Sequence, residues 1–404
     1  MTGVRRRLPR PFAGLPPEVP VLAAVALSVA VGFGVLAPAI PVFAREFGVG
    51  RTAAGAVISA FALMRLVFAL AGGRLVDRFG ERAILAAGLA IVAGSSLLAG
   101  LAQTYAQLLV LRGVGGVGSA MFTVSAVSLL LRVVGPDQRG RASGLFQGGF
   151  ILGGITGPAF GGVLSSYSVR VPFFVYAAAL GVAGSIALVA LRRASLRERA
   201  APPAPAVPTT LRTALTSPAY RTALMVNLGV GFVLFGTRNS LIPLFVLEGL
   251  RRDPVLTGLG FVLSSAAAAA LLLPAGRFSD SRGRRPALLL GGALATGSTA
   301  LLALSTAVPV YLVAMVLFGI GFGFLTPAAG AVVGDVAGGR GGTVVAAFQM
   351  ASDLGAVTGP LVAGWLADAY SFGAAFGLCA GVLALGVLLA ARMPETRVPQ
   401  EAPA

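Results

Sequence analysis

The chain has 404 residues, of which 56% are hydrophobic and only 11% are charged, and its mean hydropathy is +0.89. Soluble proteins carry about 25% charged residues, so this composition excludes a soluble domain and predicts a membrane protein. The net charge is +17, every basic residue is an arginine, and histidine is absent. A Walker-type ATP site needs lysine, so it is excluded, as are histidine-based proton relays and metal centres. The lone Cys379 allows no disulfide framework.

Apolar stretches of about 20 residues, long enough to cross a bilayer as helices, recur along the whole chain. They show no regular polar face, so we interpret them as membrane spans. We expect about twelve, at residues 20–44, 53–72, 83–103, 106–131, 143–166, 171–192, 221–247, 255–276, 286–305, 309–333, 343–368 and 371–391. The first is too long for a signal-peptide core and lacks a clear cleavage site, so we expect it to be retained.

Arginine is concentrated in the N-terminal segment, in the loops after even-numbered spans and in the C-terminal segment. The opposite loops hold only Arg45, Arg51, Arg170, Arg251 and Arg252. Because positively charged loops stay in the cytoplasm, we expect a multi-pass protein of the plasma (inner) membrane with both termini cytoplasmic. No basic domain stands outside the lipid bilayer, so nucleic acid is not an expected partner.

A segment rich in Pro, Ala and Arg at residues 192–220 separates the sixth and seventh spans. We interpret it as a cytoplasmic linker with a short surface helix near Leu211–Leu215. The predicted domains are therefore an N-terminal six-helix bundle at residues 1–191 and a C-terminal six-helix bundle at residues 221–404.

The two halves resemble each other in sequence. FQGGFILGGITGP ends at Pro158 and FQMASDLGAVTGP ends at Pro360, while GRLVDRFGER begins at Gly73 and GRFSDSRGRR at Gly276. The number of residues between the two proline-ended segments nearly equals the number between the two loop segments. The matches include Gln, Asp and Pro rather than apolar residues alone. Internal repeats of this kind mark transporters with a substrate site between the repeats near the midplane. The sequence thus predicts two pseudo-symmetric bundles.

The segment GGITGPAFGG is rich in glycine although it lies within a predicted span. Gly153, Gly157 and Gly161 share one helix face, where small residues let another helix approach closely. Pro158 cannot donate to the carbonyl of Gly154, and a neighbouring helix can satisfy that carbonyl. We interpret this helix as a closely packed element that moves during a conformational cycle; packing alone is the alternative.

Three motifs support a resemblance to a known family. GGITGPAFGG resembles the G-x-x-x-G-P-x-x-G-G signature of the fifth helix in drug:proton antiporters of the major facilitator superfamily. GRLVDRFGER is similar to the superfamily's G-x-L-x-D-R-x-G-R-R loop, and RGVGGVG to its R-x-x-Q-G-x-G fourth-helix pattern. The matching residues are Gly153, Gly157, Pro158, Gly161 and Gly162; Gly73, Leu75, Asp77, Arg78, Gly80 and Arg82; and Arg112, Gly116 and Gly118. Glu81 and Gly115 depart from these patterns.

The resemblance implies the all-α, 12-helix major facilitator fold. It also implies export driven by a proton gradient, so no cofactor is expected. Asp77 lies between Arg74 and Arg78 and would latch the cytoplasmic side of the outward-open state; a solvated turn is the alternative. The corresponding second-half residues with an expected gating role are Gly276, Asp280, Gly283 and Arg284, with Gly359 and Pro360 in the eleventh span.

Four ionisable residues are expected in the bilayer core, namely Arg65, Arg112, Arg238 and Asp353. Such residues cost about 3 kcal/mol or more at the centre of a bilayer, so each one indicates a function. We expect them to face one central cavity. Snorkelling is the alternative for Arg65 and Arg238, and a structural hydrogen bond is the alternative for Asp353. The family resemblance implies that Arg112 handles protons or holds a charged network.

Arginine stays protonated at accessible pH, although it can change how tightly a nearby carboxylate holds a proton. Asp353, the only carboxylate expected in the core, is therefore the leading proton-coupling candidate. Arg112 is the second candidate. Many relatives carry an acidic residue in the first helix, but Val19 to Ala44 contains none. Three arginines and one aspartate favour a neutral or anionic substrate over a cationic one.

Four amides are further candidates for lining the substrate cavity. They are Gln147, Gln349, Asn227 and Asn239. Hydrogen bonding between helices is the alternative role for each.

The sequence therefore predicts a monomeric secondary transporter that exports small, mostly apolar compounds in exchange for protons by alternating access. The alternative is uptake or export of an organic anion or metabolite by the same fold. A membrane enzyme would need nucleophiles, metals or acid/base pairs, and a non-transporting sensor would need an output domain. Neither pattern is found in the sequence, so an enzyme is not expected.

Overall fold

The computed structural model describes residues 15–134, 139–190, 210–337 and 342–396, and in these ranges the regular secondary structure is helical. The first half consists of α1 (Glu18–Leu36), α2 (Ala39–Arg45), α3 (Arg51–Phe79), α4 (Glu81–Gly100), α5 (Tyr105–Val133), α6 (Arg139–Tyr167) and α7 (Val171–Ala190). The second half consists of α8 (Leu211–Thr216), α9 (Pro218–Val233), η2 (Leu234–Leu241), α10 (Ile242–Leu244), η3 (Phe245–Gly249), α11 (Pro254–Arg282), α12 (Arg284–Leu304), α13 (Val308–Ala337), α14 (Gly342–Ala369) and α15 (Phe372–Arg392).

In the described residues, 11 helical segments are long and apolar enough to cross a membrane. One runs through α1 and α2 to Arg45, and another runs from α9 through η3. Helix α14 has 28 residues but carries Asp353 and Asp368, and it is not among the 11. With α14 included, every predicted span falls on a helix, which confirms the predicted all-α membrane fold. The short helix expected near residue 211 is α8.

Local sequence explains where several helices begin and end. Asp253 caps α11 by accepting a 2.8 Å hydrogen bond from the Val255 N–H, and Pro254 follows it at the first helical position. Gly80 and Gly283 have φ values of +81° and +109°, which favour glycine. These two residues join α3 to α4 and α11 to α12 without an intervening loop.

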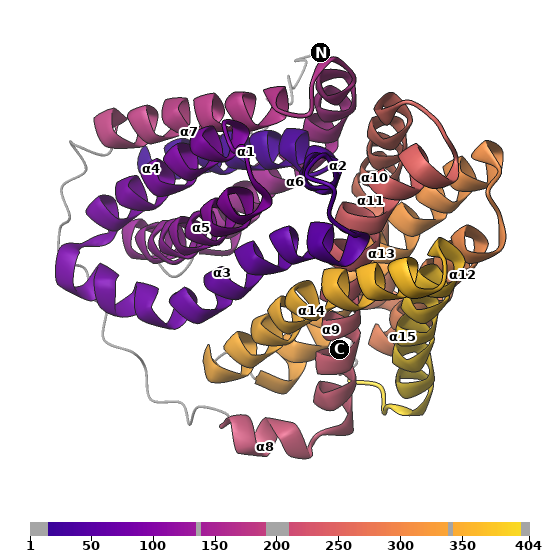
Figure 1. The fold of residues 1–404 in the computed structure, drawn as a ribbon. Helices are drawn as coiled ribbons and strands as arrows, with labels where there is room; N and C mark the ends of the chain where they lie inside the picture. The colour runs from indigo at the N-terminus through magenta and orange to yellow at the C-terminus, as the bar shows by residue number, and fades with distance from the viewer. Residues whose placement is uncertain (1–14, 135–138, 191–209, 338–341, 397–404) are drawn as a thin grey trace, which may run out of the picture.

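The two halves repeat the same helix pairings. In the first half, α1 packs on α6 and α7, both α3 and α4 pack on α5, and α4 packs on α7. In the second half, α9 packs on α14 and α15, both α11 and α12 pack on α13, and α12 packs on α15. Each half has its own apolar core, and the two lie side by side in Figure 1. The exact domain boundaries near residues 191 and 221 stay a prediction.

Glycine allows close helix contacts within each half. A Cβ atom added at Gly157 of α6 would lie 2.4 Å from the carbonyl oxygen of Val31 in α1. In the second half, a Cβ atom at Gly359 of α14 would lie 2.3 Å from the carbonyl oxygen of Phe232 in α9. Real Cβ atoms do not approach this closely, so both helix pairs depend on the missing side chain.

Two further helix pairs join the halves, namely α3 with α14 and α6 with α11. A Cβ atom at Gly55 would lie 2.3 Å from the carbonyl oxygen of Pro360. In the second pair, a Cβ atom at Gly258 would lie 2.9 Å from the carbonyl oxygen of Pro158. Both contacts lie toward the Arg51 end of the helices, so the halves are pressed together at that end.

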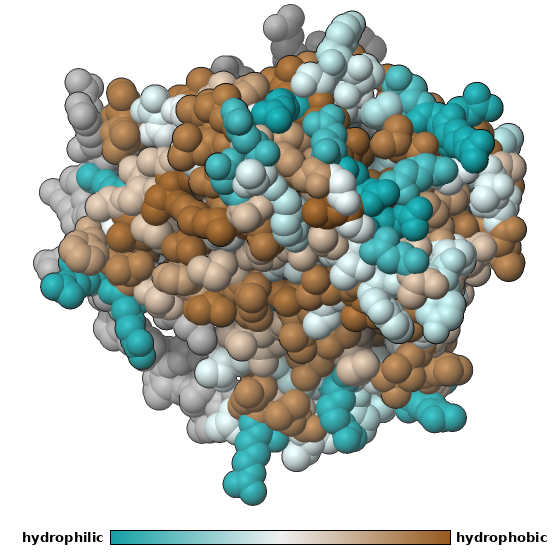
Figure 2. Space-filling model, in the orientation of Figure 1, coloured by the Kyte–Doolittle hydropathy of each residue, from teal (hydrophilic) through white to brown (hydrophobic). Residues whose placement is uncertain are grey.

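The surface of the described chain suits a lipid environment. Large apolar side chains are exposed on helices of both halves, including Val67, Phe160, Val189 and Leu388. Figure 2 shows apolar side chains over much of the visible face, with hydrophilic patches at the upper right and the lower edge. Large exposed apolar surfaces of this kind mark contact with a membrane or another protein.

We expect Gly157→Ala to weaken packing between α1 and α6. The new methyl group would meet the Val31 carbonyl, and overpacking costs about 1–3 kcal/mol. Gly154→Ala is the matched control, because no heavy atom lies within 4 Å of the Cβ position there. Chemical denaturation in detergent should show a lower free energy of unfolding for Gly157→Ala alone, and equal loss in both variants would contradict this packing.

Candidate functional site

An ion pair joins the two halves about midway along their contacting helices. Arg65 of α3 donates through Nη2 to Oδ1 of Asp353 in α14. Arg65 lies about 20 Å from the start of α3 at Arg51, and Asp353 lies about 20 Å from the end of α14 that contacts Arg51, at 1.5 Å per residue. Their side chains are 32% and 20% exposed, so both remain partly accessible. Two predicted site residues that are far apart in sequence therefore meet directly.

Arg112 of α5 occupies a different environment. It is 2% exposed, and its guanidinium carbon lies 4.5 Å from the centroid of the Phe61 ring in α3. Its Nε has no hydrogen-bond partner, and it forms no ion pair with a carboxylate in the described ranges. The structure thus pairs Asp353 with Arg65 and leaves Arg112 inside the first half, held by cation–π attraction.

Arg238 lies in η2, a π-helical segment within the seventh span. Its Nη2 donates a 2.8 Å hydrogen bond to the Ser265 hydroxyl of α11, and its guanidinium carbon lies 4.4 Å from the centroid of the Phe261 ring. Ser265 in turn donates a 2.9 Å hydrogen bond to the carbonyl of Gly154 in α6. This is the carbonyl that Pro158 leaves without a helical donor, so a side chain of the other half satisfies it.

The π-helical segment also contains buried polar atoms with no partner in the described chain. They are the hydroxyl oxygen of Ser240, the amide oxygen of Asn239 and Nε of Arg238. π-Helical turns are rare and occur often at functional sites. The sequence places Asn239 and Arg238 here as candidates but gives no sign of the change in helix type.

The other candidate amides occupy several environments. Asn227 of α9 is buried and donates a 2.7 Å hydrogen bond to the carbonyl of Phe348 in α14, which is the interhelical role. Gln349 of α14 is exposed. Gln147 belongs to α6, but its side chain lies outside the described residues. Neither Asn227 nor Gln349 has a hydrogen bond to the Arg65–Asp353 pair among the described residues.

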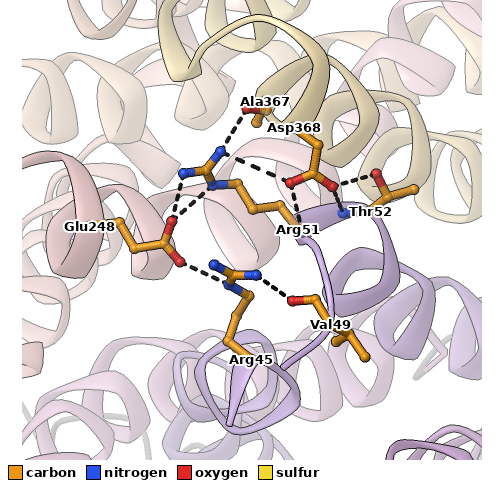
Figure 3. Close-up of polar contacts among 7 residues, drawn as sticks. All are labelled: Arg45, Val49, Arg51, Thr52, Glu248, Ala367 and Asp368. Carbon is orange, nitrogen blue, oxygen red and sulfur yellow. Dashed lines mark hydrogen bonds and ion pairs between the residues drawn. The ribbon is translucent and has the colours of Figure 1, made fainter. Parts of the chain in front are cut away.

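A second set of charges joins the halves at the ends of α2, α3, η3 and α14, and we call it the Glu248 cluster (Figure 3). It consists of Arg45, Arg51, Thr52, Glu248 and Asp368. Glu248 accepts 2.9 Å hydrogen bonds from Nε of Arg45 and Nε of Arg51. One carboxylate of the second half therefore holds two guanidinium groups of the first.

Asp368 completes the Glu248 cluster by capping α3 across the interface. Its carboxylate accepts hydrogen bonds from the backbone N–H groups of Arg51 and Thr52, at 2.9 and 2.8 Å, and from the Thr52 hydroxyl at 2.7 Å. Gly50, the residue that would normally cap this helix, has no side chain to do so. A negative charge at a helix N-terminus is favourable, so α3 is capped by the other half.

The predicted gating residues where α11 meets α12 form contacts within the second half. Arg284 pairs with Asp280 one turn earlier and, at 3.1 Å, with Asp335 of α13. No Cβ clash would arise at Gly276, which has open space beside it. This network fixes the end of α11 against α12 and α13. Among the described residues, Asp280 forms no ion pair with the first half, so a latch through Asp280 stays a prediction.

The first-half gating residues are only partly described. Gly73 and the side chain of Asp77 lie outside the residues whose surroundings are described. Arg78 is exposed, and its guanidinium carbon lies 5.3 Å from the centroid of the Phe79 ring. Arg82 is half-buried, with Nε and Nη2 lacking partners among the described residues.

The glycines of the fifth-helix motif divide between two contacts. Gly153 and Gly161 pack, like Gly157, against α1 of the same half. Gly162 packs against Gly258 of α11 in the other half. The motif therefore fixes α6 both within its own bundle and against the second one.

A family model described as the Major Facilitator Superfamily matches residues 22–251 and 228–404. The chain belongs to the major facilitator superfamily. It is 28% identical over 348 residues to Multidrug resistance protein 1 of Bacillus subtilis (strain 168), a match that covers 83% of this chain and 86% of the relative. It is 30% identical over 164 residues to Quinolone resistance protein NorA of Staphylococcus aureus (strain MRSA252), covering 40% of this chain and 41% of that protein.

The fold is similar to that of solved transporters. A bacterial homologue of the human lysosomal transporter Spinster, crystallised in an inward-facing and unoccupied conformation, superposes with a TM-score of 0.75 at 18% identity, covering 93% of this chain and 95% of that one. Likeness at this identity shows the fold, and it confirms the predicted arrangement of two six-helix bundles in a multi-pass membrane protein.

Sequence reasoning missed Glu248, Asp368, Thr52 and Ser265. From the sequence, Arg45 and Arg51 indicate only on which side of the membrane their loops lie. Their position at the ends of spans, in loops otherwise poor in charge, was a usable signal, because isolated charges at such ends need partners. Ser265 gave no signal, since serine is common in membrane helices.

We expect Glu248→Gln to loosen the halves at the Glu248 cluster. Losing a charge-assisted hydrogen bond costs about 1–2 kcal/mol, which shifts an equilibrium about five- to thirtyfold. Spin labels at the exposed Gln103 and Thr306, with buried Cys379 changed to alanine, should report a longer distance by electron paramagnetic resonance. Exposed Glu46→Gln is the matched control. A distance distribution unchanged by Glu248→Gln would show that the cluster does not hold this end closed.

Proposed function

We propose that this transporter exports small, mostly apolar compounds in exchange for protons, by alternating access, with Asp353 as the proton-coupling residue. The observation that carries the proposal is the ion pair between Asp353 and Arg65, because it ties one half to the other midway along α3 and α14. A titratable group in that position can link proton binding to movement of the halves.

The coupling follows from simple electrostatics. Ionised Asp353 attracts Arg65 and favours contact between α3 and α14 at this height. Protonation removes the negative charge and the attraction, while Arg65 keeps its positive charge. A proton that enters from one side of the membrane and leaves to the other thereby changes the relative stability of the two conformations. Arg112 is not part of this ion pair, and it stays a buried positive charge within the first half.

The direction of transport rests on topology and relatives. The positive-inside rule predicts that the arginine-rich loops face the cytoplasm, which puts the Glu248 cluster at the outer side. With the halves pressed together there, the described conformation corresponds to one closed to the outside. Relatives named for multidrug and quinolone resistance support export of drug-like compounds. The protein is proposed to act as a monomer in the plasma membrane, without a cofactor and without enzymatic activity.

The test is transport of a labelled quinolone into inside-out vesicles with an imposed pH gradient. We expect the wild-type protein to accumulate the compound only while the gradient is present, and Asp353→Asn to abolish that gradient-dependent part. Asp253→Asn is the matched control, because it removes a carboxylate while asparagine still caps α11.

Proton release offers a second readout on purified protein. Adding the quinolone should release protons from wild-type protein and from Asp253→Asn, but not from Asp353→Asn. Unchanged release or transport in Asp353→Asn would remove this residue from the coupling mechanism. Accumulation by the wild type without a gradient would contradict proton exchange altogether.

A further inference from the structure

The positive charge of Arg238 has no compensating negative charge in the described chain. Its hydrogen-bond acceptors are neutral: the Ser265 hydroxyl at 2.8 Å and, at 3.5 Å, the carbonyl of Phe261. Its Nε is buried and has no partner. None of the ion pairs found among the described residues includes it.

Arg65 shows what such a charge normally requires. It lies midway along a membrane helix, and it is paired with Asp353. A charged group away from water is costly unless it is paired and hydrogen-bonded, and membrane arginines usually pair with carboxylates or carbonyls. Because Asp353 is already engaged with Arg65, the described residues supply no second core carboxylate for Arg238.

Arg238 also lies between the two bundles and is not sealed within one of them. Arg238, Ser265 and Gly154 are each partly exposed, and their hydrogen bonds bring together η2, α11 and α6 from both halves. Arg112, the other predicted core arginine without an ion pair among the described residues, is only 2% exposed and lies within the first half. The unpartnered donor of Arg238 is thus at the junction between the bundles, where this fold class binds substrate.

We propose that Arg238 binds the carboxylate of an anionic substrate with an apolar body, so that monoanionic amphipathic acids are the preferred substrate class. This inference rests on the proposed transport function and narrows its substrate. A guanidinium group fits a carboxylate with two parallel hydrogen bonds. The apolar body is accommodated by neighbours such as Phe261, whose ring already lies against the guanidinium.

The binding step also affects the contact between the halves. Arg238 presently holds Ser265, and Ser265 holds the Gly154 carbonyl of α6. A bound carboxylate competes with the Ser265 hydroxyl for the donors of Arg238. Occupancy of the site therefore competes with the hydrogen bond between η2 and α11, made by the same serine that links α11 to the Gly154 carbonyl of α6.

The test compares two forms of one probe, nalidixic acid and its neutral methyl ester, by equilibrium dialysis with purified protein at neutral pH. A charge-assisted hydrogen bond is worth enough to favour the acid by about ten- to hundredfold. Arg238→Gln should bring the ratio of the two affinities close to one while ester binding is retained, which also shows that the variant is folded. Arg238→Lys keeps the charge and should keep part of the preference.

Asp353→Asn separates this inference from proton coupling. It should lose gradient-driven transport but keep the preference for the acid, because Arg238 is unchanged. If Arg238→Gln keeps the preference, or if the wild type binds the ester as tightly as the acid or binds neither, the carboxylate site is wrong. Those outcomes leave the role of Asp353 to be decided by the transport measurement alone.

Discussion

Close backbone contact between helices of the two halves brings the charged groups at their junction within reach of one another. Gly55 against Pro360 and Gly258 against Pro158 bring α3 to α14 and α6 to α11 at distances that side chains would prevent. At that separation, an arginine and an aspartate on facing helices can meet across the interface, and a serine hydroxyl can reach a backbone carbonyl. The glycines thus make the polar contacts possible, and the polar contacts hold the glycine-lined surfaces in register.

The two repeats share their packing residues but differ in their charges. Gly153, Gly157, Pro158 and Gly162 of α6 recur in α14 as Gly355, Gly359, Pro360 and Gly364, and the same helix pairs form in both halves. Asp353, however, corresponds in the repeat to Ile151, and Arg238 corresponds to Leu36. Packing must be preserved in both halves for a pseudo-symmetric movement, whereas a single titratable group can control it. The functional chemistry therefore lies in the residues that break the repeat.

Sequence alone predicts the helices, the repeat and the small-residue face of α6, because hydropathy and helical spacing are local properties. It also identifies Arg65, Arg238 and Asp353, since charged residues are conspicuous in apolar spans. It does not show that Arg65 meets Asp353, because the partners lie on different halves and their approach depends on tertiary packing. For the same reason the Glu248 cluster and the π-helical turn were not predicted. The remaining assignments of site residues stay predictions.

The cap that Asp368 provides for α3 has a consequence for the movement between conformations. When the halves part at this end, the first amide groups of α3 lose the carboxylate that accepts their hydrogen bonds. Gly50 has no side chain to replace it, so these amide groups turn to water, at a cost of about a few tenths of a kcal/mol with glycine at the cap. Opening toward this side thus leaves a helix end without its cap, which adds a small preference for the closed arrangement.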